Sequence, residues 1–257
     1  MAILEVSFRA QSLNMDTYFN VILPQNGPEE DIPTLYLLHG MHGNHSHWLN
    51  KSCIEQYANE RKLAVIMPDG ENSYYTDMKY GKNFYTYVAD ELVDYTRRIF
   101  KISRKREKTF ICGLSMGGYG ALHTALKKPE QYAAAASLSG VVDIASRVKT
   151  CSWTKEAAAI WGDNFMNEVP DSDADLLWLV KTFPDNLPRP RIYVACGRQD
   201  TLYKDNITFR DFMYTVGKEK GFDFKYEEGD GAHNWEFWNK WVVPAIDFML
   251  ENKPQIK

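Results

Sequence analysis

The pentapeptide Gly113-Leu114-Ser115-Met116-Gly117 constrains this chain more than any other stretch. The short apolar run 108–112 precedes it, and small or helix-forming residues follow it. A serine at a sharp turn between a strand and a helix is held in a strained conformation with its hydroxyl exposed, and flanking glycines let the two elements pass closely. The helix N-terminus adds partial positive charge and free N–H groups beside it. The pattern predicts that Ser115 is a nucleophile and that the N–H of Met116 binds an oxyanion.

Apolar runs of strand length recur along the chain and predict an α/β fold. The predicted strands cover residues 34–38, 63–67, 108–112, 132–138, 191–196 and 222–227, after a hairpin formed by residues 5–11 and 17–23. Helical periodicity falls between them, at residues 52–61, 84–100 and 235–250. Nearly continuous apolar strands separated by helices are typical of a parallel sheet covered on both faces. We therefore expect a mostly parallel central sheet flanked by helices.

The connection over residues 143–189 differs from the others. It is longer, and it contains helical patches, acidic turns and the tryptophans Trp153, Trp161 and Trp178. A long insertion between core strands commonly forms a lid or a pocket wall. We expect a helical insertion near the active site. Nothing resembling a linker divides the chain, so we expect one domain over residues 1–257.

Charge and apolar content exclude several classes of protein. The net charge is -4 with both signs interspersed, which gives no support to nucleic-acid binding. No stretch approaches the roughly 18 apolar residues of a membrane span, and the N-terminus lacks the features of a signal peptide. We expect a cytoplasmic protein with no membrane partner. Cys112 and Cys196 lie in strand-like runs, so we expect buried free thiols.

A serine nucleophile requires a base, and the sequence offers one histidine in the right order. A hydroxyl is a poor nucleophile at neutral pH, so a histidine must accept its proton and a carboxylate must orient that histidine. α/β-Hydrolases present these groups in the order serine, acid, histidine. His233 is the only histidine after the predicted elbow helix, and it follows the last predicted strand in a loop of small residues. We predict that His233 is the base.

Three aspartates are candidates for the acid. Asp200 comes directly after the penultimate predicted strand, Asp143 follows the strand after the elbow, and Asp230 lies close to His233 in sequence. Chain order favours Asp200, although an acid can be presented from the end of either strand. An aspartate that only caps the next helix is the alternative for each strand-end position.

The loop after the strand 34–38 is a candidate for the second oxyanion donor. It reads His39-Gly40-Met41-His42-Gly43, and its glycines allow backbone N–H groups to turn inward. We predict that the N–H of Met41 is this donor. The four histidines His39, His42, His45 and His47 also raise the alternative of a metal-dependent hydrolase or a binding protein. Their spacing fits no metal motif, and we predict no metal.

Five stretches together resemble the tributyrin esterase branch of the esterase D-like α/β-hydrolases, a group that includes feruloyl esterases, acetyl xylan esterases and S-formylglutathione hydrolases. They are residues 37–44, 65–68, 105–110, 113–120 and 233–238. The resemblance implies an α/β-hydrolase fold, a triad of Ser115, Asp200 and His233, oxyanion donors at Met41 and Met116, and hydrolysis of short acyl esters without a cofactor. The loop 39–43 departs from the motif of the S-formylglutathione hydrolases, which argues against that activity.

The nature of the substrate is the least constrained prediction. We expect a serine carboxylesterase that acts on small-molecule esters with short acyl chains, with acetyl or feruloyl esters of plant sugars as further candidates. An acyltransferase would use the same acyl-enzyme, and a homo-oligomer is an open alternative. Four tryptophans are candidates to line an apolar pocket, although core packing is the simpler explanation for each: Trp48, Trp153, Trp161 and Trp235.

Overall fold

A computed structural model describes residues 1–251 and shows one eight-stranded sheet. The strand order is β1-β2-β4-β3-β5-β6-β7-β8. The strands are β1 (Ala2–Ala10), β2 (Met15–Leu23), β3 (Thr34–Leu38), β4 (Ala64–Pro68), β5 (Thr109–Leu114), β6 (Ala134–Leu138), β7 (Arg191–Gly197) and β8 (Phe224–Gly229). Each predicted strand is present within a few residues of its predicted bounds. The predicted domain, 1–257, includes residues 252–257, which lie outside the described part.

The sheet is mostly parallel, as predicted. β1 pairs antiparallel with β2, and β2 pairs antiparallel with β4, whereas every pair from β4 through β3 to β8 is parallel. The parallel strands therefore end at the same edge of the sheet. Ligands of open α/β sheets bind outside the carboxyl ends of the strands, so this edge is where the predicted site residues should meet.

Both faces of the sheet are buried over its central strands, β3 to β7, which explains why these strands are nearly continuously apolar. Along β3, Leu35 and Leu37 pack on one face, whereas Tyr36 and Leu38 pack on the other, and all four are fully buried. Because side chains alternate along a strand, a sheet covered on both sides needs apolar residues at every position.

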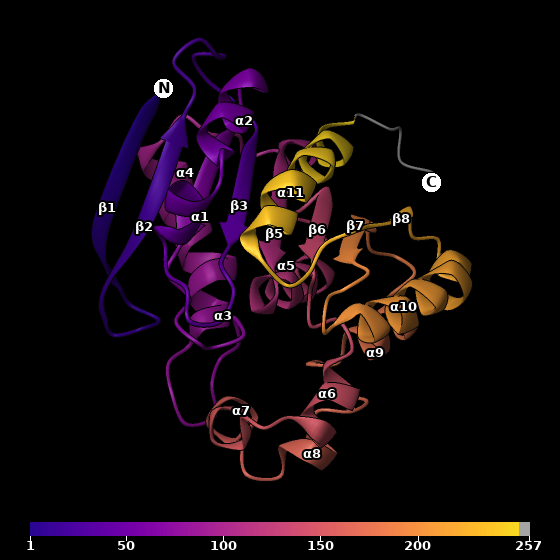
Figure 1. Cartoon of the computed structure of the whole chain (residues 1–257). Helices are drawn as coiled ribbons and strands as arrows, with labels where there is room; N and C mark the ends of the chain where they lie inside the picture. Colours follow the sequence, from indigo (N-terminus) through magenta and orange to yellow (C-terminus); the bar gives the residue numbers. More distant parts are fainter. Residues whose placement is uncertain (252–257) are drawn as a thin grey trace.

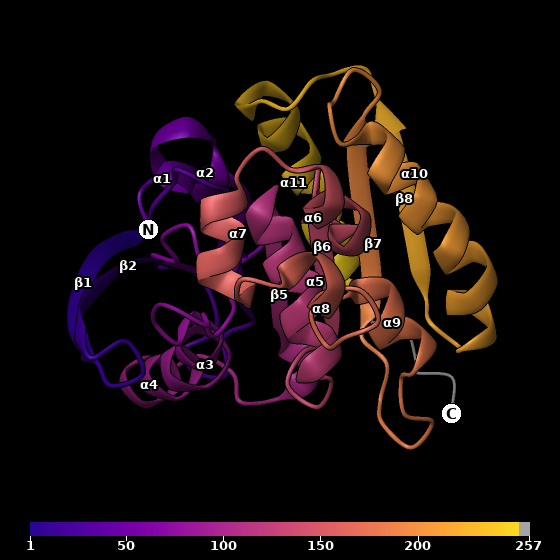
Figure 2. The same cartoon turned by 90° about the horizontal axis from the view of Figure 1, so that it is seen from below.

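Helices cover the two faces and fill the connections (Figures 1 and 2). α2 and α11 pack against one face, and α5 and α10 pack against the other. The helices of the main body are α1 (His47–Lys51), α2 (Ile54–Glu60), α3 (Phe84–Thr86), α4 (Leu92–Ile99), α5 (Met116–Lys127), α10 (Tyr203–Phe212) and α11 (Trp235–Leu250). Tyr87–Glu91 and Met213–Gly217 are π-helical turns, and Arg106–Lys108 is a 3-10 turn. None of these helices, nor any other in residues 1–251, combines the length and apolar character needed to cross a bilayer.

Two helices, α1 and α10, have no counterpart among the predicted elements. α10 contains Asp205, Asn206 and Thr208, residue types that favour helices only weakly. Packing supplies what propensity lacks, because Phe209 is fully buried and the Asn206 amide donates to the carbonyl oxygen of Gly140.

The predicted insertion between β6 and β7 is helical. It contains α6 (Ile144–Thr150), α7 (Thr154–Trp161), α8 (Phe165–Glu168) and α9 (Leu176–Lys181). Figure 1 shows α6, α7 and α8 beyond the edge of the sheet toward which β3 points, and Figure 2 shows α7 in front of this edge. This part of the insertion therefore lies at the carboxyl ends of the parallel strands, whereas α9 packs against α5.

Candidate active site

Ser115 lies in the sharp turn between β5 and α5. Its backbone has φ 53° and ψ -119°, a strained conformation for a residue with a side chain. The turn is also too tight for larger neighbours: a Cβ atom at Gly113 would lie 2.2 Å from the carbonyl oxygen of Gly117. The Ser115 N–H donates to the carbonyl oxygen of Leu138 at the end of β6, at 2.9 Å. The local sequence thus places the hydroxyl at the carboxyl edge of the sheet, where the turn predicts it.

The structure brings the three predicted catalytic side chains together. The Nε2 atom of His233 lies 2.9 Å from the Ser115 Oγ, and its Nδ1 atom lies 2.9 Å and 3.1 Å from the two carboxylate oxygens of Asp200. An ionised carboxylate can only accept hydrogen bonds, so Nδ1 must carry the proton that it donates to Asp200. Nε2 is then free to accept the proton of the serine hydroxyl, which is the arrangement that activates a serine.

Asp200 is the carboxylate that contacts the base. Its side chain is fully buried, and it also accepts from the N–H of Leu202 at 2.8 Å. Burial raises the pKa of Asp200, but the hydrogen bonds from His233 and from Leu202 outweigh it and hold the pKa below its usual value. The other two candidate aspartates have other partners. Asp143 caps α6 by accepting from the N–H of Ser146, and the exposed Asp230 pairs with an arginine.

Two hydrogen bonds fix the loop of His233 to the loop of Asp200. The Gly231 N–H donates to the side-chain oxygen of Gln199 at 2.7 Å, and the Gln199 N–H donates to the carbonyl oxygen of Gly231 at 3.1 Å. Gly231 has φ 150° and would not accommodate a Cβ atom, which would lie 2.6 Å from the ring of Phe237. The ring of Trp238 packs edge-on against that of His233, with centroids 4.9 Å apart. The base is therefore held from several sides.

The N–H of Met116 lies directly after the nucleophile at the start of α5. Met116 is the first residue of α5, and the first N–H groups of a helix have no acceptor within the helix. The loop 39–43 lies directly against the same turn: a Cβ atom at Gly40 would lie 3.2 Å from the Cβ of Ser115, and one at Gly117 would lie 2.5 Å from the carbonyl oxygen of His39. The loop that carries Met41 is thus close enough to contribute the second donor.

His39 supports this loop from within the core, a role that the sequence did not reveal. It is 1% exposed, its Nδ1–H donates to the carbonyl oxygen of Gly40 at 2.7 Å, and its Nε2 accepts from the N–H of Gly70 at 2.9 Å. The Tyr75 hydroxyl donates to the carbonyl oxygen of His39 at 3.0 Å. The only available signal was the position of His39 at a strand end, which does not distinguish a positioning residue from a pocket residue.

The four loop histidines do not converge on a common point. His45 lies near Asp69 and Glu5, and the ring of His47 packs on Trp235, while both nitrogens of His39 already have partners. Among residues 1–251, no three histidine, cysteine, aspartate or glutamate side chains gather as metal ligands would. Within this part of the chain, the loop histidines give the metal-dependent alternative no support.

The four candidate tryptophans have different surroundings. Trp48 is 1% exposed and donates from its ring N–H to the carbonyl oxygen of Leu38, so it belongs to the core. Trp235 packs edge-on against Trp48. The rings of Trp153 and Trp161 both contact the ring of Tyr74, with centroid distances of 5.2 Å and 5.3 Å. These contacts join the insertion to the connection after β4.

Comparisons with known proteins place the chain in a family. The model of the putative esterase family matches residues 10–249. An acetyl esterase from Caldicellulosiruptor saccharolyticus is 36% identical, over 97% of this chain and 98% of its own length. Two solved structures are each 32% identical. One is the substrate-bound fluorophosphonate-binding serine hydrolase FphF of Staphylococcus aureus, with a TM-score of 0.88 over 98% of this chain and 99% of that one. The other is the S-formylglutathione hydrolase FrmB of Staphylococcus aureus, with a TM-score of 0.86 over 97% and 99%.

Proposed function

The chain belongs to the putative esterase family and is a serine hydrolase of carboxylic esters, and within that class we propose that it releases short acyl groups, acetyl above all, from alcohols. The observation that carries the catalytic assignment is the continuous hydrogen-bonded path from the Ser115 hydroxyl through His233 to a buried Asp200. The acetyl preference is supported by the acetyl esterase that is 36% identical over nearly the whole chain.

The reaction proceeds in two acyl transfers. His233 accepts the hydroxyl proton at Nε2 while the Ser115 Oγ attacks the ester carbonyl, and Asp200 stabilises the resulting imidazolium. The N–H groups of Met116 and Met41 bind the oxyanion of the tetrahedral intermediate. Its collapse breaks the bond to the alcohol oxygen, which takes the proton from His233. Water then attacks the acyl-enzyme in the same way and releases the acid and the free serine.

Hydrolysis fits the site better than transfer to another alcohol. An acyltransferase must exclude water from the second step. Here the His233 side chain is 29% exposed and Ser115 is only half-buried, so water reaches both groups. The acyltransferase alternative therefore has no structural support in the described residues.

S-Formylglutathione hydrolysis is the second candidate. The departure of loop 39–43 argues against it, but the 32% identical structure that carries this name shares the fold over 97% of this chain. Both activities use the same acyl transfer and differ in the acyl group and in the alcohol or thiol that leaves. Feruloyl ester hydrolysis stays a prediction from the sequence.

A substrate panel tests the proposal. We expect kcat/KM to be highest for acetyl esters and to fall from p-nitrophenyl acetate through the butyrate to the octanoate. The same panel includes S-formylglutathione, a feruloyl ester and acetylated xylo-oligosaccharides. A higher kcat/KM for S-formylglutathione than for every acetyl ester would contradict the proposal and favour the second candidate.

A further inference from the structure

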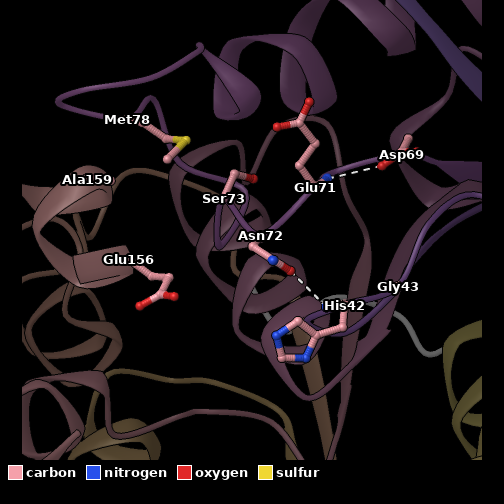
Figure 3. Close-up of a pocket in the computed structure, with 9 residues that line it drawn as sticks. All are labelled: His42, Gly43, Asp69, Glu71, Asn72, Ser73, Met78, Glu156 and Ala159. Carbon is pink, nitrogen blue, oxygen red and sulfur yellow. Dashed lines mark hydrogen bonds between the residues drawn. The ribbon is translucent and has the colours of Figure 1, made fainter. Parts of the chain in front are cut away.

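A pocket of about 490 Å³ opens beside the oxyanion loop. Its volume is within the range of small-molecule sites. The walls come from three segments: the loop 39–43, the connection after β4 and the insertion helix α7 (Figure 3). Six of the lining residues have polar side chains: His42, Asp69, Glu71, Asn72, Ser73 and Glu156.

The pocket lies against the same loop backbone that packs on the nucleophile. Gly43 lines the pocket, and a Cβ atom there would lie 2.8 Å from the carbonyl oxygen of Gly40. Gly40 in turn packs against Ser115, as described above. The pocket is therefore a neighbour of the nucleophile on the side of the oxyanion loop, away from β7 and β8.

The walls of the pocket are fixed to one another. The N–H groups of Lys79 and Tyr80 donate to the carbonyl oxygens of Ile160 and Ala159, at 2.8 Å and 2.9 Å, and so join the connection after β4 to α7. The side-chain oxygen of Asn72 accepts from the N–H of His42 at 2.7 Å, which joins the same connection to the oxyanion loop. The pocket is therefore formed before a substrate binds.

Negative charge dominates the lining. Asp69, Glu71 and Glu156 face the pocket, and its lining includes no lysine or arginine. Glu71 pairs with Lys82 at 3.0 Å, which offsets one charge. In the described residues Glu156 has no hydrogen bond or ion pair, and it is exposed on α7 (Figure 3). Its charge is therefore the one least compensated by protein groups.

We propose that this pocket holds the part of the ester that extends from the reacting carbonyl. It favours neutral hydroxylated or cationic groups there, and Glu156 is the specificity-determining residue that disfavours anionic groups. The inference rests on the proposed ester hydrolysis at Ser115. It also bears on the second candidate, because glutathione carries two carboxylates and one ammonium group and so enters with net negative charge. The pocket disfavours that thiol as a leaving group.

Two sets of esters, each varying the charge of one group, test the proposal. One set places the charge on the alcohol: acetyl esters of choline, of its uncharged tert-butyl analogue and of hydroxyethanesulfonate. The other places it on the acyl group: methyl esters of a trimethylammonium-butanoic acid, of its uncharged tert-butyl analogue and of glutaric acid. In at least one set, we expect kcat/KM of the cationic ester to exceed that of the anionic ester, and we expect the ratio to shrink at high salt.

Charge removal at one position identifies the group responsible. We expect Glu156→Gln to lower the cationic-to-anionic ratio about three- to tenfold, the size expected of partly exposed charges, and Glu156→Lys to reverse it. Glu219→Gln is the matched control, because it removes the same charge near the start of β8, at the opposite edge of the sheet, and should leave the ratio unchanged.

Each outcome is decisive for this inference. A preference in one set only would support it and show whether the pocket holds the alcohol or the acyl part. Equal rates for cationic and anionic esters in both sets, or the same ratio in Glu156→Gln as in Glu219→Gln, would overturn it. The uncharged esters report the hydrolase activity separately, so a failure of the proposed function would be visible as the absence of their turnover.

Discussion

The two sides of Ser115 are built differently. On the side of β7 and β8, Asp200 and His233 sit a few residues beyond their strands, and reciprocal hydrogen bonds hold their loops together. On the side of β3 and β4, the pocket is made by the long connection 69–83 and by a helix of the insertion. Several lining or neighbouring residues there have positive φ, among them His42, Glu71 and Tyr74.

The difference follows from what each side must do. Proton transfer requires atoms within hydrogen-bond reach, and short loops at the ends of buried strands provide that precision. Substrate selection requires a shape that can vary between relatives, and long connections supply it. Changes on the first side should therefore abolish turnover, whereas changes on the second should alter selectivity, stability or the positioning of the oxyanion loop.

The largest effect is expected at the nucleophile. Ser115→Ala removes the attacking oxygen, and kcat should fall by more than about 10^4-fold, because the members of a triad act as a unit. Turnover of p-nitrophenyl acetate measures this, and covalent labelling by a fluorophosphonate, located by mass spectrometry, should disappear from the peptide that contains residue 115. Retention of most activity would place the nucleophile elsewhere.

The next effect is expected at the acid. A carboxylate accepts hydrogen bonds at both oxygens, whereas the amide in Asp200→Asn also donates from its nitrogen. His233 then no longer keeps its proton on Nδ1, so Nε2 cannot accept the serine proton. We expect kcat to fall by about 10^3- to 10^4-fold. Asp143→Asn is the control, since Asp143 only caps α6. If Asp143→Asn were the more damaging of the two to kcat, with both variants folded, the assignment of the acid would be wrong.

A smaller loss is expected at the support of the oxyanion loop. His39→Gln keeps a polar group but cannot bridge the Gly40 carbonyl oxygen and the Gly70 N–H as the imidazole does. We expect kcat to fall about 10- to 100-fold, less than or comparable to the loss of one oxyanion donor. KM and the unfolding midpoint, measured together with kcat, separate this positioning effect from a general loss of structure. An unchanged kcat would show that the loop does not depend on His39.

The smallest effect concerns stability, at the contact between α5 and the insertion. His123 of α5 is 4% exposed, and its Nε2 lies 2.9 Å from the carbonyl oxygen of Asp173, so it helps anchor the insertion. Burial lowers the pKa of His123 to about 4. At pH values below the ordinary pKa of histidine, about 6.5, and above about 4, the imidazole of residue 123 is protonated in the unfolded chain and neutral in the folded chain. Folding stability is therefore lost as the pH falls through this window.

Urea unfolding at pH 7 and pH 4.5 measures this loss. His123 should account for about 2 to 3 kcal/mol of the difference in the free energy of unfolding between the two values. His123→Gln lacks the titrating group, so its free energy of unfolding should change less over the same interval. Parallel losses in the variant and in the wild type would mean that His123 does not titrate as described.

The sequence allowed the catalytic side to be predicted almost completely, because each of its parts has a local signal. Glycines on both sides of Ser115 mark the turn, because they allow the strand and the helix to pack closely. Asp200 and His233 follow strands in a fixed chain order. In the sequence, chain order only favoured Asp200 over Asp143, since both follow strands. Contact with His233 distinguishes them in the structure.

The pocket side had no comparable signal. Glu156 lies in an amphipathic helix, where an exposed glutamate is expected without any role in binding. Asn72 and Tyr75 belong to a connection with no recognisable motif, and their partners in the loop 39–43 are some 30 residues away in sequence. Trp48, a candidate for the pocket, is part of the core instead.

The sequence by itself determined the fold class, the position of the elbow and the order of the groups that follow it, because strand periodicity and the requirements of a tight turn are local properties of the chain. Only the tertiary structure decided which aspartate meets the base, which histidine supports the oxyanion loop and which carboxylates share a pocket. Those outcomes depend on contacts between segments that are distant in sequence, and their geometry is fixed by packing across the whole sheet rather than by any single stretch of residues.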